Sequence, residues 1–380
     1  MQRLASLDAF RGFAIASMVL VNNPGDWGRL YPPLAHAEWN GWTFTDLVFP
    51  FFLFAAGVSM ALSIERRKNI GDDPAKILHE LVRRAAVIFL VGLALNLFPS
   101  FDFSTLRIPG VLQRIALCIL VAAPFAIYST SKSIVIWIAT LLAAYTIPML
   151  LVPVPGPDGA VATGLLSPGR DFGAWLDRGL LDGHLWSRSR TWDPEGLWST
   201  LPAVCSLLFG VLAGRRLLTA SGGITASGAL LVAGLGALGL GLVLDAVLMP
   251  INKNLWTPAY CVFMTGWSLV VFAAFHAAMD ATGSRALRIG ARRAVLPLTI
   301  FGMNALFLFA LSGFVGRLLG MIQIAGERGA VMPLKTWLHA PFQALPIAPE
   351  NASLLFAIAF EAAMFAVAWA MWKKQWFVKA

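Results

Sequence analysis

Apolar residues occur in ten long runs along this chain, and shorter polar segments separate them. A hydrophobic helix of about 20 residues is long enough to cross a bilayer, and most of these runs approach that length. Gly and Pro residues interrupt several runs, and the third and sixth runs are short. The pattern predicts an all-α bundle of about ten transmembrane helices, over residues 8–24, 44–63, 84–98, 110–128, 133–152, 197–214, 227–248, 258–279, 294–315 and 353–372.

The composition also indicates a polytopic membrane protein. Apolar residues make up 58% of the 380 residues and charged residues 13%, and the mean hydropathy is +0.72. Soluble domains are near half apolar and about a quarter charged. We therefore expect one transmembrane domain over 1–380, with outer loops at about 25–43, 153–196 and 316–352. The three cysteines lie in apolar runs and are expected to be buried free thiols.

The net charge of +9 does not indicate nucleic-acid binding, because the basic residues lie in short loops between apolar runs. If the N-terminus is cytoplasmic, the inner segments hold seventeen Lys and Arg residues and the longer outer loops hold ten. Inner loops of membrane proteins carry the excess of Lys and Arg. We therefore predict that both termini face the cytoplasm and that His36 lies on the outer side.

The stretch from His36 to Ser59 combines polar residues with an apolar run. It begins HAEWNGWTFTD and continues into a predicted helix that holds one carboxylate, Asp46, close to its start. A charge inside a membrane helix costs about 2.5–3.5 kcal/mol, so Asp46 needs a partner or a task. Pro50 has no N–H, which leaves the backbone carbonyl of Asp46 without its helical donor. We interpret this stretch as the reactive centre.

His36 and Asn22 are the polar residues expected near this centre. His36 precedes Asp46 by ten residues, and an imidazole oriented by a carboxylate can act as a general base near pH 7. In the first predicted helix, Asn22 lies on the same face as Arg11 and at the outer end. There it could donate to a carbonyl oxygen or cap the helix. Asp8 and Arg11 are spaced to form an ion pair at the inner end.

Other polar positions have less certain tasks. Asp193 and Glu195 of WDPEG could hold a cationic amine or sugar hydroxyls, or could belong to a solvated loop. Polar residues within apolar runs should face the bundle interior, where they are paired or line a cavity; they include Arg114 and Asn304. The sequence contains no P-loop, no HExxH and no zinc-ligand spacing, so it supports neither a nucleotidase nor a metalloenzyme.

Six segments together resemble the transmembrane acyltransferase family that includes heparan-α-glucosaminide N-acetyltransferase. They occur in the family's order and extend over most of the chain: SLDAFRG with VNN (6–23), HAEWNGWTFTDLVFPFFLFAAG (36–57), RIPGVLQR (107–114), WDPEG (192–196), PINKNLW (250–256) and GMN (302–304). The resemblance implies a bacterial-type member without the soluble N-terminal domain of the lysosomal proteins. The family also has a histidine nine residues after the methionine of GMN, and this chain has Ser312 there.

The resemblance implies transfer of an acetyl group from cytosolic acetyl-CoA to the amine of a glucosamine-like sugar on the outer side of the membrane. It places the family's histidine, asparagine and aspartate on His36, Asn22 and Asp46. We expect the acetyl-CoA site to use basic and polar residues, namely Arg11, Arg114, Lys253, Asn254, Arg66 and Arg84. We expect the acceptor site to use Asp193, Glu195, Trp39, Asn40 and Asn304. No metal is expected.

Several alternatives stay open. His36 could act as a general base or could carry the acetyl group in a two-step route. A sugar transporter would use the same intramembrane charges to line a path, although no internal repeat is evident. A non-catalytic scaffold is a third option, and the presence of the complete His36, Asn22 and Asp46 set argues against it. We expect a multi-pass protein of a bacterial inner membrane, with a homodimer as the family suggests.

Overall fold

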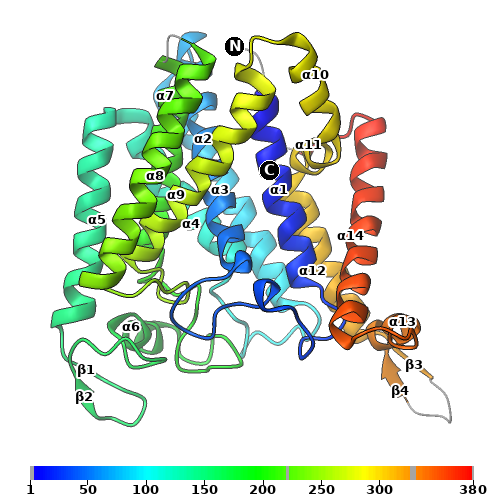
Figure 1. The fold of residues 1–380 in the computed structure, drawn as a ribbon. Coiled ribbons are helices and arrows are strands. Elements are labelled where there is room, and N and C mark those ends of the chain that lie inside the picture. The colour runs from blue at the N-terminus through cyan, green and yellow to red at the C-terminus, as the bar shows by residue number, and fades with distance from the viewer. Residues whose placement is uncertain (1–3, 220–221, 326–330, 379–380) are drawn as a thin grey trace.

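The computed structural model describes residues 4–219, 222–325 and 331–378 and shows a bundle of long helices (Figure 1). The helices of the bundle are α1 (Ala5–Asn22), α2 (Phe44–Asn69), α3 (Pro74–Leu97), α4 (Val111–Tyr128), α5 (Ser131–Leu151), α7 (Thr200–Thr219), α8 (Gly223–Val247), α9 (Pro258–His276), α11 (Leu296–Met303), α12 (Ala305–Met321) and α14 (Pro349–Lys373). The predicted all-α polytopic membrane protein is confirmed. Each of the ten predicted runs lies in this set of helices.

By length and composition, the described helices offer fewer than ten candidate spans. Eight of the described helices are long and apolar enough to cross a membrane, and a ninth span is possible if α11 and α12 count as one. These two helices are bent by 83° at Asn304, so the single helix predicted over 294–315 is broken. The third run lies in α3, whose first half is charged; its apolar half is shorter than the about 20 residues that a span needs.

Successive helices alternate in direction, which gathers the long connections at one end of the bundle. This loop end comprises residues 23–43, 98–110, 152–199, 248–257, 322–325 and 331–348. The opposite end holds the start of α1 and the short helix α10 (Arg285–Ala294), and we call it the amino-terminal end (Figure 1). His36 and the two large predicted loops therefore share one end. Which end faces the cytoplasm stays a prediction from the charge distribution.

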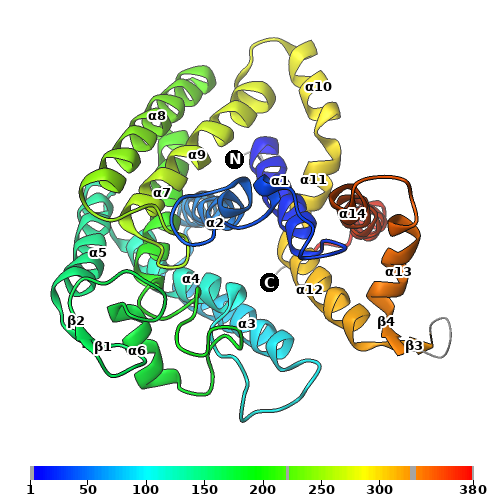
Figure 2. The same cartoon turned by 60° about the horizontal axis from the view of Figure 1, so that its bottom comes forward.

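The loop end carries most of the small elements. Figure 2 shows β1, β2 and α6 on one side of it and β3, β4 and α13 on the other. Strand β1 (Val154–Pro155) pairs with β2 (Val161–Ala162), and β3 (Gln323–Ala325) pairs with β4 (Val331–Pro333), both antiparallel. The short helices are α6 (Phe172–Leu181) and α13 (Leu334–Gln343). A 3-10 turn at Pro32–Leu34 and a π turn at Ala277–Ala281 are the remaining elements. The third predicted outer loop is shorter than expected, because α12 continues to Met321 and α14 begins at Pro349.

Polar residues before several helices explain where they begin. Asp73 accepts a hydrogen bond from the backbone N–H of Ala75, and Pro74 occupies the first position of α3. Thr257 accepts from the N–H of Tyr260 at 3.3 Å, with a proline again following the cap. A side-chain oxygen that satisfies a free N–H stabilises a helix start by about 1 kcal/mol. The Thr257 cap also fixes the first turn of α9, which carries Tyr260.

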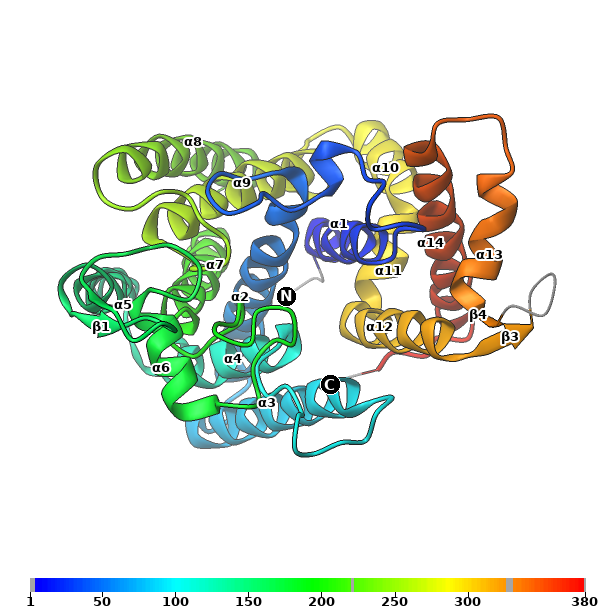
Figure 3. The ribbon, with the colours of Figure 1, turned by 90° about the horizontal axis from the view of Figure 1, so that it is seen from below.

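Helix α2 lies at the centre of the bundle, where Figure 3 shows it among α1, α4, α7 and α9. Its residues are largely buried, whereas those of α5 and α8 are mostly exposed at the periphery. Two glycines let α2 and α7 approach closely. A Cβ atom on Gly57 would lie 2.0 Å from the carbonyl oxygen of Leu207, and one on Gly210 would lie 2.1 Å from that of Phe54. Small residues allow this backbone contact in membrane bundles.

We predict that Gly210→Ala destabilises the protein, because its methyl group would collide with the backbone of α2. The expected loss is roughly 1–3 kcal/mol of unfolding free energy. The matched control is Gly236→Ala on α8, where a new Cβ would meet nothing within 4 Å. Thermal unfolding midpoints in detergent measure both variants. Equal midpoints would show that the α2–α7 contact does not need a glycine.

Candidate active site

His36 pairs with the buried Asp46 in the first turn of α2. The His36 Nδ1 atom lies 2.6 Å from Oδ1 of Asp46, and the second carboxylate oxygen accepts backbone N–H groups from Ala37 at 3.1 Å and Thr43 at 3.0 Å. The Asp46 side chain is 1% exposed, while that of His36 is 46% exposed. A carboxylate with only acceptor sites selects the tautomer with the proton on Nδ1. The Nε2 atom is then the basic nitrogen.

The backbone carbonyl that Pro50 leaves without a helical donor has a partner. The hydroxyl of Tyr260 donates to the backbone oxygen of Asp46 at 2.6 Å. Tyr260 is fully buried in the first turn of α9. This bond fastens the start of α2 to α9, so the pyrrolidine ring does not leave a bare acceptor in the bundle.

His36 opens onto a cavity of about 640 Å³ at the loop end, which we call the active cavity. Its volume is within the usual range for small-molecule sites. Predicted site residues on its wall are Asn22, His36, Trp39, Glu195, Lys253 and Asn254. Other wall residues include Trp27, Val48, Phe49, Arg107, Val111, Trp186, Arg188 and Trp192. The three residues that the sequence placed at the reactive centre therefore lie around one cavity, with Asn22 and His36 on its wall and Asp46 behind His36.

Lys253 lies against the His36 ring. Its Nζ atom is 3.2 Å from Nε2 and 3.4 Å from Nδ1 of the imidazole. Nearly equal distances to both nitrogens place Nζ over the face of the ring, since an atom in the ring plane would collide with a ring carbon. Burial lowers the pKa of Lys253, although the Glu195 and Asp46 carboxylates oppose this shift. The in-plane lone pair of Nε2 is thus not taken by the ammonium.

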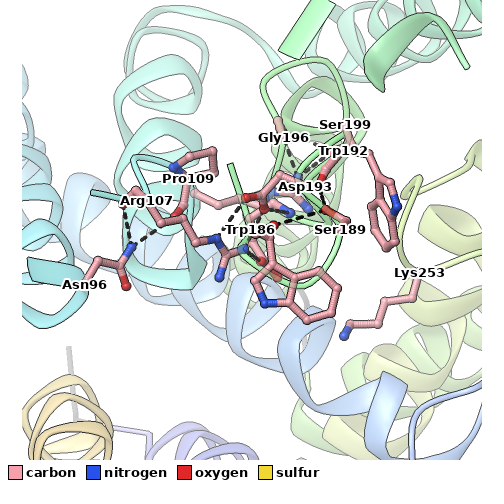
Figure 4. A network of polar contacts seen from close by, with 12 residues as sticks. Asn96, Arg107, Pro109, Trp186, Ser189, Trp192, Asp193, Gly196, Ser199 and Lys253 are labelled. Carbon is pink, nitrogen blue, oxygen red and sulfur yellow. Dashed lines mark hydrogen bonds and ion pairs between the residues drawn. The ribbon is translucent and has the colours of Figure 1, made fainter. Parts of the chain in front are cut away.

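Arg107 joins the RIPG segment to the WDPEG segment (Figure 4). Its Nε and Nη2 atoms donate to both oxygens of Asp193 at 2.8 and 2.5 Å, and Nη2 also donates to Glu195 at 2.6 Å. Asn96 holds the backbone oxygens of Arg107 and Pro109 at 2.9 and 3.1 Å. Arg107, Asp193 and Glu195 form a group that we call the Arg107 cluster. Its two carboxylates share one guanidinium, so the three side chains together carry excess negative charge.

The two carboxylates of the Arg107 cluster differ. Burial raises the pKa of Asp193, whose side chain is fully covered, and the bonds from Arg107 oppose that shift. Burial also acts on Glu195, but the charges of Arg107, Arg114 and Lys253 hold its pKa below the usual value. Glu195 faces the active cavity and Asp193 lies behind it. Of Asp193 and Glu195, Glu195 is therefore the one that a cationic amine in the cavity would meet; Glu38 also lies on the wall.

Arg114 supports the Arg107 cluster from within the bundle. Its Nη2 atom donates to the carbonyl oxygen of Gly196 at 3.0 Å and to the hydroxyl of Ser199. Its guanidinium lies 5.3 Å from the ring centre of Trp256. Arg114 is 1% exposed and lines neither the active cavity nor the cavity that holds the predicted acetyl-CoA residues Arg11 and Arg84.

A second cavity, of about 110 Å³, lies between the active cavity and the amino-terminal end. Arg11 and Arg84 line it together with Ser59 and Ser63 of α2, and we call it the Arg11–Arg84 cavity. It is about one helical turn from the active cavity along α2 and α4. Phe49 and Val111 line the active cavity, and Phe52 and Ile115, three and four residues later, line the Arg11–Arg84 cavity. One turn rises about 5.4 Å. A narrow apolar stretch therefore separates two polar sites.

Four other predicted residues lie elsewhere or have other partners. Asn304 is in neither cavity: its amide donates to the Trp376 carbonyl at 3.0 Å and accepts from the Val378 N–H at 2.9 Å. It bonds residues 376 and 378 at the α11–α12 break, away from the walls of both cavities, so its role at the acceptor site stays a prediction. The remaining three are Asn40, bonded to Asn252 outside the cavity wall; Arg66, exposed near the end of α2; and Trp39, on the wall with its indole N–H bonded to Leu166.

Sequence reasoning did not single out several residues of the site. Arg107 and Trp192 lie in the segments RIPGVLQR and WDPEG, yet neither was assigned a role. The Trp192 ring packs edge-on against Trp39 at 5.1 Å and lies 5.7 Å from Trp186. The signal in the sequence was the presence of Trp39, Trp186 and Trp192 in two predicted outer loops, which could have indicated an aromatic site. They give the active cavity an aromatic wall beside the carboxylate of Glu195.

Comparison with known proteins gives two kinds of match. Residues 3–170 match the family model described as heparan-alpha-glucosaminide N-acetyltransferase, catalytic. Heparan-alpha-glucosaminide N-acetyltransferase of Mus musculus is 30% identical over 335 residues, which covers 74% of this chain and 50% of the relative. The Homo sapiens protein of the same name is 29% identical over 335 residues, with 74% and 49% covered. The chain spans about half the length of these curated relatives.

We predict that Arg107→Met destabilises the protein by roughly 3–5 kcal/mol, because Asp193 and Glu195 would stay buried without their cation. The control is Arg170→Met, whose partner Asp158 at 2.5 Å is exposed. Such a surface pair contributes about 0–1 kcal/mol. Unfolding midpoints in detergent at one pH measure both. Similar losses in the two variants would contradict the burial argument.

Asp177 of α6 gives a pH-dependent prediction. Burial, aided by the charge of Asp193, raises its pKa to about 7, although the Leu197 N–H donates to it at 2.9 Å. The folded protein thus binds this proton more tightly than the unfolded chain. Ionisation of Asp177 therefore lowers the unfolding free energy as the pH rises from about 4 to about 7.

Asp177→Asn removes that ionisation and keeps an oxygen for the Leu197 N–H. We expect a higher unfolding midpoint than the wild type at pH 8 and a similar midpoint at pH 4. A series of thermal unfolding curves between these two pH values measures the difference. A difference that does not vary with pH would contradict the assignment of a raised pKa to Asp177.

Proposed function

We propose that this chain, which is similar to heparan-alpha-glucosaminide N-acetyltransferase over 74% of its length, transfers an acetyl group from acetyl-CoA to the amine of an amino sugar. The observation that carries the proposal is the His36–Asp46 pair at 2.6 Å, open to the active cavity beside Asn22. A histidine that presents a basic nitrogen to a cavity is suited to remove a proton from an attacking amine.

His36 is the general base of the proposed mechanism. Its Nε2 atom removes the proton as the acceptor nitrogen attacks the thioester carbon, and Asp46 keeps the ring oriented through Nδ1. The Asn22 amide donates to the carbonyl oxygen, where negative charge develops. The C–N bond forms, the C–S bond breaks, and the proton held by His36 passes to the sulfur of CoA. An acetyl-His36 intermediate is the two-step variant of the same chemistry.

The carboxylate of Glu195 and the aromatic wall support an amino sugar as the acceptor. An ionised Glu195 attracts a cationic amine to the cavity, and the tryptophans offer flat apolar faces to a sugar ring. The bound ammonium first releases one proton to solvent, the neutral amine is the nucleophile, and His36 takes the second proton as the nitrogen attacks. Trp39 forms part of the wall of this region, and Asp193 accepts a hydrogen bond from Arg107 behind it.

The Arg11–Arg84 cavity is suited to the donor. Two guanidinium groups and two serine hydroxyls are chemically matched to the phosphates of CoA. An uncharged pantetheine arm crosses the apolar turn between the cavities far more cheaply than phosphates would. Lys253 and Asn254, which the sequence assigned to the donor, lie in the active cavity and are nearer to the thioester end. We propose that the amino-terminal end is cytoplasmic, in a bacterial inner membrane.

A transporter is the second candidate, because the break between α11 and α12 has an 83° bend. Discontinuous helices often form the substrate sites of transporters. Here the break is occupied by the chain end, which bonds to Asn304. The acyltransferase proposal accounts for the His36–Asp46 pair, and the transporter does not need it.

We predict that purified wild-type protein in liposomes transfers label from radiolabelled acetyl-CoA to glucosamine, and that His36→Ala lowers turnover by about 10²–10⁴-fold through loss of the base. The control is His79→Ala, an exposed histidine on α3. His79→Ala should keep the wild-type unfolding midpoint, whereas His36→Ala should lower it because Asp46 loses a donor, so turnover is compared below the midpoints of all three proteins. Near-normal turnover in His36→Ala would refute its role. Labelled glucosamine that crosses the bilayer without acetylation would favour the transporter.

A further inference from the structure

The short helix α10 lies at the amino-terminal end of the bundle, on its outside (Figure 1). It connects two candidate membrane spans. Three residues separate it from the end of the span Pro258–Ala281, and one residue separates it from the bent pair of α11 and α12, which begins at Leu296. A helix of ten residues is about 15 Å long. Both ends of α10 are therefore held close to the level at which the chain leaves the bilayer.

Helix α10 has little support from the rest of the chain. None of its residues is buried, and its main neighbours are the segments directly before and after it, Ala277–Ala281 and α11. Leu287 is 68% exposed and Ile289 is 40% exposed. An isolated helix of fewer than about 12 residues is only marginally stable in water. We therefore expect a partner outside the described residues to stabilise α10.

The charge of α10 indicates the chemistry of that partner. Its four arginines are Arg285, Arg288, Arg292 and Arg293, and no Asp or Glu occurs from residue 281 to residue 326. At 3.6 residues per turn the four fall within about 140° of the helix circumference. Arg292 pairs with Asp280 at 2.7 Å, and within the described residues the other three form no ion pair with a carboxylate. This face of α10 is complementary to an anionic surface.

We propose that α10 binds the phosphate groups of anionic phospholipids in the leaflet at the amino-terminal end. Guanidinium groups bind phosphate oxygens through two parallel hydrogen bonds. Amphipathic helices with basic polar faces lie at the headgroup level of a bilayer and bury apolar side chains just below it. Leu287 projects from the side of α10 opposite the arginines and is exposed, so it is suited to that apolar contact. Lipid binding of this kind is independent of acetyl transfer.

Arg292 connects the proposed lipid surface to the start of α1. Its Nη2 atom donates to one oxygen of Asp280 at 2.7 Å, and the other oxygen of Asp280 accepts the backbone N–H of Ser6 at 2.9 Å. Its Nε atom donates to the carbonyl oxygen of Met279 at 3.0 Å. Lipid that holds α10 therefore also holds the first turn of α1 and the end of α9. We expect such binding to raise the unfolding midpoint of the protein.

The phosphates of CoA suit this surface less well. No residue of α10 lies on the wall of the Arg11–Arg84 cavity. A helix without a buried residue offers nothing to enclose a nucleotide, whereas it can lie flat against a layer of headgroups. The positions of the arginines, in a short connection between two spans, place them where lipid phosphates are abundant.

The test titrates the purified protein in mild detergent with phosphatidylglycerol, which is anionic, or phosphatidylcholine, which is zwitterionic, and records the unfolding midpoint. We expect phosphatidylglycerol to raise the midpoint in a dose-dependent way and phosphatidylcholine to raise it less. The α10 variant combines Arg285→Gln, Arg288→Gln and Arg293→Gln and leaves Arg292 with Asp280. Its apparent affinity for phosphatidylglycerol should fall by more than about tenfold, because three charges beside an anionic surface are lost.

The matched control removes three exposed cations from the same end outside α10, through Lys76→Gln, Lys132→Gln and Arg216→Gln. It should keep most of the response to phosphatidylglycerol. A variant with Lys in place of Arg285, Arg288 and Arg293 should also keep most of it, because the charge is retained. Equal losses in the control and the α10 variant would overturn the proposal. Equal responses of the wild type to the two lipids would do the same.

Two further measurements separate lipid binding from a folding defect and from CoA binding. If the α10 variant does not fold, the wild type decides: its response to phosphatidylglycerol should weaken in about 0.5 M salt through screening, and a response that salt leaves unchanged would overturn the proposal. Whatever rise acetyl-CoA produces in the wild type should persist in the α10 variant. Loss of that rise with a retained response to phosphatidylglycerol would assign α10 to CoA and overturn the lipid proposal.

Discussion

The burial of the Asp46 carboxylate is the constraint on which the loop end depends. One oxygen lies 2.6 Å from His36, and the other accepts the backbone N–H groups of Ala37 and Thr43. An ionised carboxylate at 1% exposure is stable only if several donors surround it. The chain from 36 to 43 must therefore fold over the start of α2, where the helix N-terminus adds a partial positive charge. The same bonds that fold this segment also orient the imidazole.

The sequence predicted this centre because its parts are neighbours in the chain. His36 precedes Asp46 by ten residues, and Pro50 follows four residues later, so local rules of helix structure and membrane burial apply. The ten apolar runs were visible for the same reason. The family resemblance supplied the role of Asn22, which spacing alone left open between a cap and an oxyanion donor. Its place on the active-cavity wall agrees with that role without testing it.

Features that join distant segments could not be predicted in this way. The hydroxyl that donates to the backbone oxygen of Asp46 comes from Tyr260, 214 residues away. A tyrosine in an apolar run is usually part of the core, so its sequence position did not indicate this bond. Arg107 and Asp193 are 86 residues apart, and no periodicity relates two loop residues across that interval. The bend at Asn304 lies in a run that is apolar on both sides, so hydropathy could not show it. Tertiary packing decides each case.

Helix α2 connects the two ends of the proposed reaction. Thr45 lies on the wall of the active cavity, and Ser63 lies on the wall of the Arg11–Arg84 cavity, both on this one helix. At 1.5 Å per residue the helix advances about 27 Å between them. A packed central helix cannot shorten or lengthen, so α2 fixes the distance between the two cavities. In the proposed reaction, a thioester anchored by its phosphates would bring its reactive carbon to His36 only if its arm matched that span, which implies that donors are selected by the length of the arm.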